Sequence, residues 1–168
     1  TPQVERSGGS IKFKNVVHEY SLAKAIQGGF VKEPAVATRK DFDPSQYSND
    51  ELDRIKLEDG IRIHEDTKVA LDIYARDNRV KAVKPFVLVV AQDTTHAGKL
   101  RHLIISNAFF EGNYADKVME IHSSQTGSEK EENIAQLISL EKPENKIEIV
   151  IHVNMLKEGW DVTNLYTI

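Results

Sequence analysis

Residues 157–161, Lys-Glu-Gly-Trp-Asp, are the segment of this sequence best suited to bind a nucleotide. They follow the run 147–153, which predicts a buried strand, and α/β proteins place ligands at the carboxyl ends of such strands. Gly159 permits a tight turn and a close approach of the backbone to a phosphate or sugar. Asp161 could accept a hydrogen bond from a ribose hydroxyl. The alternative is a plain turn in which Asp161 caps the following helix.

The other residues with ligand chemistry do not form a recognisable site in the sequence. The closest pair of histidines, His96 and His102, is six residues apart, which does not place both rings on one helical face. Residues 97–99, Ala-Gly-Lys, lack the earlier glycine and the following Ser or Thr of a phosphate-binding loop. Cysteine is absent, which excludes disulfides and thiolate ligands. We therefore predict no metal site.

The second half of the chain alternates predicted strands with predicted helices. Strands are expected over 86–91, 117–122, 147–153 and 165–168. Between them, apolar residues at helical spacing predict two buried helix faces, Leu100, Leu103 and Ile104 in one and Ile134, Leu137 and Ile138 in the other. Strands joined through helices run parallel with right-handed crossovers, so we expect a three-layer α/β domain.

The first half is less regular. Residues 16–20 predict a strand, and Ser21 predicts the start of a short helix that Gly28 and Gly29 close. Residues 38–60 are polar and are interpreted as an exposed linker or arm. A second helix is expected over 63–78, where apolar residues pair at i,i+4.

Composition and charge are those of an ordinary globular protein. The chain has 168 residues, 40% hydrophobic and 29% charged, and its net charge is −4. Residues 1–85 carry 15 Lys and Arg against 14 Asp and Glu, and residues 86–168 carry 7 against 12. No basic stripe typical of a nucleic-acid-binding protein follows from these numbers. No apolar run approaches the roughly 20 residues that a membrane span needs.

Three segments, in order, resemble one protein family. Residues 155–165, MLKEGWDVTNL, closely resemble motif V of the endonuclease subunits of type III restriction systems, which are superfamily 2 DNA-dependent ATPases. Residues 17–34 are similar to the stretch that follows motif III in that family, and residues 86–96, FVLVVAQDTTH, to its motif IV strand and loop.

The resemblance implies a fold and a division of the chain. The expected architecture is a partial RecA-like α/β domain with a mostly parallel sheet, the second motor domain of a helicase, over 85–168. A connecting segment over 1–37 and a polar arm with a helix over 38–84 would precede it.

The resemblance also implies site residues. Gly159 and Asp161 match the part of motif V that faces ATP between two motor domains. The positions that match DNA-backbone contacts are Thr94, Thr95, His96, Ser123, Ser124, Met155, Leu156 and Lys157. Contacts of this kind position a strand without reading its sequence.

The implied activity belongs to a longer protein. That protein would be a bacterial cytoplasmic restriction enzyme using ATP and Mg²⁺, with DNA and a modification methyltransferase subunit as partners. The present sequence contains neither a Walker A string nor an Asp-Glu-x-His string, so we expect it to bind neither cofactor alone and not to hydrolyse ATP. As a partial sheet, it could self-associate through an unpaired edge. Two alternatives remain, another superfamily 2 motor or a non-catalytic α/β module that binds a ligand or a protein.

Overall fold

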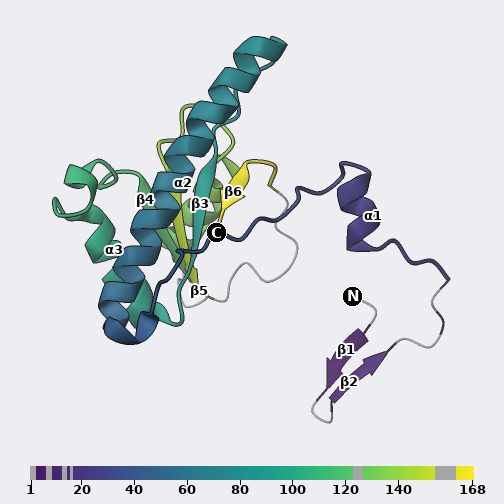
Figure 1. The fold of residues 1–168 in the computed structure, drawn as a ribbon, viewed down its shortest axis with the longest axis horizontal. Helices are drawn as coiled ribbons and strands as arrows, with labels where there is room; N and C mark the ends of the chain where they lie inside the picture. Colours follow the sequence, from purple (N-terminus) through teal and green to yellow (C-terminus); the bar gives the residue numbers. More distant parts are fainter. Residues whose placement is uncertain (1–2, 7–8, 13–14, 16, 123–126, 154–161) are drawn as a thin grey trace. The chain divides into compact units, whose positions relative to one another are not determined.

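The computed structural model describes residues 3–6, 9–12, 15, 17–122, 127–153 and 162–168. The chain divides into two compact units, Thr1–Asp43 and Pro44–Ile168. Figure 1 follows the elements of both units along the chain.

The described part of the first unit holds a hairpin and a short helix. Strand β1 (Gln3–Arg6) pairs antiparallel with β2 (Gly9–Lys12), which the sequence analysis did not predict. Helix α1 (Leu22–Gln27) begins after Ser21, whose hydroxyl accepts a hydrogen bond from an amide of the first turn, and ends at Gly28. The short helix predicted from these two residues is therefore confirmed.

The strand predicted over 16–20 is wrong for residues 17–20, which have no regular structure. Val17 is 99% exposed, so its side chain does not hold this segment in an extended form. Since a strand needs a partner for its backbone hydrogen bonds, an apolar pair of residues alone does not make one.

Helix α2 (Asn49–Asn78) opens the second unit, after a 3-10 turn at Pro44–Gln46, and has 30 residues. At 1.5 Å per residue it is about 45 Å long. A capping box fixes its start, because the Ser48 hydroxyl accepts from the Glu51 amide and the Glu51 carboxylate accepts from the Ser48 amide at 2.8 Å.

The length of α2 corrects the expectation of an exposed linker for residues 49–60 and of a helix that starts near residue 63, whereas residues 38–48 are exposed apart from Phe42. Leu57 and Ile61 are buried against the sheet, although charged residues surround them in the sequence. The charges lie on the outer side of the helix, so the average polarity of the segment concealed a narrow apolar face.

The second unit is built on a parallel sheet of four strands. Its strands are β3 (Phe86–Val90), β4 (Val118–His122), β5 (Ile149–Val153) and β6 (Leu165–Thr167). Their order is β4-β5-β3-β6, and every pairing is parallel. The predicted α/β class with a parallel sheet is confirmed, and the arrangement is compatible with a partial RecA-like domain. Among the described residues β4 and β6 are the outer strands, and self-association through them stays a prediction.

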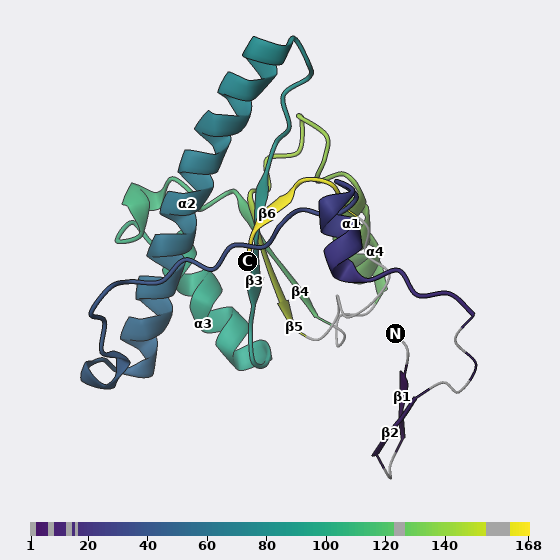
Figure 2. The same cartoon turned by 45° about the vertical axis from the view of Figure 1, so that its right-hand side comes forward.

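Helices cover both faces of this sheet (Figure 2). Helices α2 and α3 (Thr94–Ile105) share one apolar cluster with β3, β4 and β5, and the cluster includes Ile61 and Ile104. Helix α4 (Gly127–Ile138) lies on the other face, where Leu137 packs with residues of β3, β4 and β5.

The predicted buried face of α4 is partly wrong. Of its three apolar residues, Leu137 is buried, whereas Ile134 and Ile138 are exposed. Of the three, only Leu137 belongs to the apolar cluster on this face of the sheet. No helix in the described residues is both long and apolar enough to cross a membrane.

Candidate functional site

The residues predicted to contact ATP or DNA follow three strands, β3, β4 and β5, and these strands end at the same edge of the sheet. We call the side at which the parallel strands end the carboxyl edge, and the side at which they begin the amino edge. Val90 of β3 is in register with His152 of β5, and Val153 of β5 with His122 of β4. The Ala91 amide then donates to the His152 carbonyl at 3.0 Å. The chain segments after β3, β4 and β5 therefore start side by side.

The helices that follow β3 and β4 in the sequence lie on opposite faces of the sheet. After β3 the chain enters α3, on the face that α2 also covers. Helix α4, which comes next in the sequence after β4, lies on the other face. Open α/β sheets bind ligands at the carboxyl ends of their strands, so the carboxyl edge is the candidate site.

Two of the predicted DNA-contact residues, Thr94 and Thr95, are exposed at this edge. They lie in the first turn of α3 rather than in a loop, because the Asp93 side chain accepts from the His96 amide at 2.8 Å and begins the helix there. Their hydroxyls therefore stand beside the free amides of a helix N-terminus, a place that favours anions.

The third predicted contact in this turn, His96, is held by the protein itself. Its Nε2 lies 2.9 Å from Oδ2 of Asp53 on α2, and its Nδ1 accepts from the Gln92 amide at 3.2 Å. The ring is half-buried, with 18% of its side chain exposed. His96 thus connects α2 to the loop after β3.

A polar hollow of about 340 Å³ surrounds this connection. The first turns of α2 and α3 and the loop after β3 line it, through residues that include Lys56, Lys99, Thr95 and Gln92. Lys56 and Lys99 are exposed cations, and Nζ of Lys99 lies 3.7 Å from a carboxylate oxygen of Asp50, which is also exposed. Sequence reasoning missed Lys56 because the segment that holds it was interpreted as a linker, and it considered Lys99 only within a phosphate-binding loop, which it rejected.

The remaining predicted site residues fall outside the described parts of the chain. These are Ser123, Ser124, Met155, Leu156, Lys157, Gly159 and Asp161. The described strands β4 and β5 end directly before the two segments that contain them.

His152, near the end of β5, is a buried polar residue at the same edge. It is 7% exposed, and its Nδ1 has no hydrogen-bond partner among the residues that the structure describes. Burial lowers the pKa of His152, so its neutral form is favoured in the fold.

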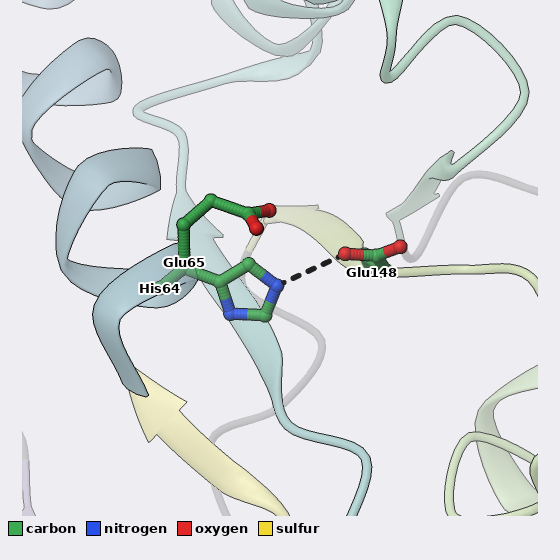
Figure 3. Close-up of side chains that lie close together, drawn as sticks. All are labelled: His64, Glu65 and Glu148. Carbon is green, nitrogen blue, oxygen red and sulfur yellow. Dashed lines mark hydrogen bonds and ion pairs between the residues drawn. The ribbon is translucent and has the colours of Figure 1, made fainter. Parts of the chain in front are cut away.

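A second cluster of charged residues lies at the amino edge (Figure 3). Glu148, which precedes β5, accepts from His64 Nε2 at 3.2 Å and from Lys68 Nζ at 2.9 Å, both on α2. Lys117, which precedes β4, lies 2.9 Å from its other oxygen. Burial alone would raise the pKa of Glu148, but the hydrogen bonds from these three groups outweigh it and hold the pKa well below its usual range.

Glu65 and Tyr114 extend this cluster. The Tyr114 hydroxyl donates to Glu65, and burial together with this bond raises the pKa of Tyr114 far above its usual range. Lys68 also bonds to Glu65 at 3.0 Å, so a single ammonium bridges two carboxylates. The cluster therefore ties α2 to the start of the sheet.

Three members of the cluster have atoms spaced for a metal ion. The ligand atoms of His64, Glu65 and Glu148 lie within 4.8 Å of one another. However, the Lys68 ammonium already lies between the two carboxylates, and the Lys117 ammonium compensates the far oxygen of Glu148. A divalent ion would have to displace Lys68, so these residues fit a partly buried ion-pair network better than a metal centre.

No known family model matches this chain, and no curated protein is significantly similar to it.

Proposed function

We propose that this chain is part of the ATP-dependent DNA-translocating motor of a type III restriction endonuclease subunit. In this role it forms one wall of the ATP cleft and part of the DNA track. One observation supports the proposal most. The segment that resembles motif IV includes β3 and continues past its end, and the segment that resembles motif V comes after β5, and these two strands are parallel neighbours that end at the carboxyl edge.

The proposed roles follow the two resembling segments. Gly159 and Asp161 face the ATP, with Asp161 accepting a hydrogen bond from the nucleotide. Contacts to the DNA backbone come from Thr94, Thr95, Ser123, Ser124, Met155, Leu156 and Lys157. His96 is the least direct candidate, since both ring nitrogens already have partners. ATP and Mg²⁺ act in the longer protein, in the bacterial cytoplasm, together with a modification methyltransferase subunit.

The exposed groups at the carboxyl edge support a track that follows phosphates. Thr94 and Thr95 stand at a helix N-terminus, and Lys56 and Lys99 add two cations beside them. Groups of this type position a nucleic acid through its backbone and supply salt-dependent affinity. The net acidity of residues 86–168 does not exclude this, because the contacts would be local.

A non-catalytic binding module is the second candidate, and the same hollow gives it some support. Asp50, Asp53 and Asp93 also line the hollow. A module that recognises a cationic ligand or protein would use these carboxylates rather than the lysines. Another superfamily 2 motor is a third possibility that shares the first mechanism without the restriction activity.

The test is DNA-stimulated ATP hydrolysis by the longer protein, wild type beside Asp161→Ala. We expect stimulation in the wild type, and a loss of at least about tenfold in kcat/KM for the variant, as for one charged hydrogen bond worth about 1.5–3 kcal/mol. The matched control is Asp116→Ala, an exposed carboxylate that pairs with Lys146 at the amino edge, and we expect it to behave like wild type. A wild type that hydrolyses no ATP with any DNA contradicts the motor and favours the binding module.

A further inference from the structure

Asp53, His96 and the Gln92 amide form a continuous chain of hydrogen bonds at the carboxyl edge. The backbone amide of Gln92 can only donate, so Nδ1 of His96 must accept at this contact of 3.2 Å. The ring proton is then on Nε2, which donates it to Asp53 across 2.9 Å. This tautomer is assigned from the partners, since each nitrogen has one neighbour that fixes its role.

The chain of bonds begins on a rigid element and ends on a loop. Asp53 lies one turn before Leu57 and two turns before Ile61, which anchor α2 in the core. Gln92 is the second residue after β3, and its side chain is exposed. The first residue after the strand, Ala91, needs no such support because its amide bonds to the His152 carbonyl within the sheet.

The contacts exclude one role that an Asp-His pair could have. A general base needs a free ring nitrogen directed at a proton of the substrate. Both nitrogens of His96 are occupied by protein groups, and the Nδ1 contact ends on a backbone amide. The pair is therefore arranged to hold a loop in place rather than to move a proton.

We propose that Asp53 is a positioning residue for the loop after β3. Through the His96 ring it fixes the Gln92 amide, and with it the direction in which Gln92 and Thr94 face at the carboxyl edge. The consequence for DNA binding rests on the proposed function, whereas the positioning itself does not. A partly exposed pair of this kind contributes little to global stability, so its effect is expected to be local.

The experiment uses the 168-residue chain and three variants. Asp53→Ala removes the acceptor for Nε2, whereas Asp53→Asn keeps a side-chain oxygen that can accept the same bond. Asp72→Ala is the matched control, because Asp72 is an exposed aspartate of α2 that pairs with Arg76. Amide hydrogen exchange is followed by NMR at Gln92, with the Ala91 amide as an internal reference.

We expect Gln92 to exchange about tenfold faster in Asp53→Ala and at the wild-type rate in the other two variants, because local opening sets the rate of exchange. Ala91 should be unchanged throughout. Exchange at Gln92 that is unaffected in Asp53→Ala overturns the positioning role. So does equal acceleration at Gln92 and Ala91, which indicates a global loss of stability.

Binding to a 20-base-pair DNA duplex separates this inference from the proposed function. We expect severalfold weaker binding for Asp53→Ala and wild-type affinity for Asp53→Asn and Asp72→Ala. If the wild type does not bind the duplex, the proposed function fails, while the exchange result still decides the positioning role. Equal affinity in wild type and Asp53→Ala, despite faster exchange at Gln92, overturns the link between the loop and DNA.

Discussion

At the amino edge of the sheet the charged side chains are bonded to one another around the buried Glu148, whereas at the carboxyl edge two lysines are exposed. Glu148 accepts from three cationic or polar donors, and Lys68 bridges it to Glu65. At the other edge Lys56, Lys99 and the two threonines of α3 are exposed. Charges of the first kind hold elements together, and charges of the second kind remain available to a ligand. From this difference we expect the amino edge to serve stability, and the proposed function places binding at the carboxyl edge.

The largest effect that tests this difference is the loss of Glu148. We expect Glu148→Gln to lower the free energy of unfolding by about 1.5–3 kcal/mol, because His64 and two partly exposed ammonium groups lose their charged acceptor. Denaturant unfolding measures it. Glu144→Gln, an exposed residue four positions earlier, is the control and should change stability by less than about 0.5 kcal/mol. Equal stability of the two variants would contradict the structural role of the amino edge.

A smaller effect is the pH dependence of stability, which differs between His152 at the carboxyl edge and Glu148 at the amino edge. The folded pKa of His152 lies below its usual 6.5, so the unfolded chain binds its proton first and stability falls as pH drops below about 6.5. The folded pKa of Glu148 lies below its usual 4.5, so its contribution is present above about 4.5 and is lost at lower pH.

Variants identify the source of each loss. Across pH 7.5 to 5.5, His152→Leu should lose less stability than the wild type, because the buried imidazole is gone. Below pH 4.5, Glu148→Gln should show a flatter dependence than the wild type. Chemical denaturation at a series of pH values measures both. A His152→Leu profile parallel to the wild type would show that burial of this ring has no cost on protonation.

Much of the sheet could be predicted from the sequence because its strands are short apolar runs between helices. Strands β3, β4, β5 and β6 and the start of α1 all have local signals in residue type and spacing. Helix α2 was misjudged for a physical reason. Its buried face in the first half consists of Leu57 and Ile61 among charged residues, and only packing against the sheet shows that these two define the helix.

The ion network at the amino edge had no signal in the sequence. Glu148 alternates with isoleucines in the sequence, which does not indicate its partners. It is buried beside His64, Lys117 and Lys68, the last of which is 80 residues away. The His96 contact with Asp53 is equally distant in sequence, at 43 residues. Partners of this kind are set by tertiary structure, so the residue types alone could not reveal them.

The most direct test of DNA binding at the carboxyl edge compares two hollows, each lined by two exposed lysines. Lys56 and Lys99 line the hollow at the carboxyl edge, and Lys142 and Lys146 line another, of about 410 Å³, beside the start of β5. The measurement is the affinity of the 168-residue chain for a DNA duplex over a series of salt concentrations. Each double substitution by alanine removes the same charge.

We expect the Lys56→Ala/Lys99→Ala chain to bind more weakly and to reduce the slope of log affinity against log salt by about 0.9 for each lost phosphate contact. The Lys142→Ala/Lys146→Ala chain should keep the wild-type slope. Equal losses of affinity in the two double variants would contradict a DNA site at the carboxyl edge, because binding would then depend on net charge alone.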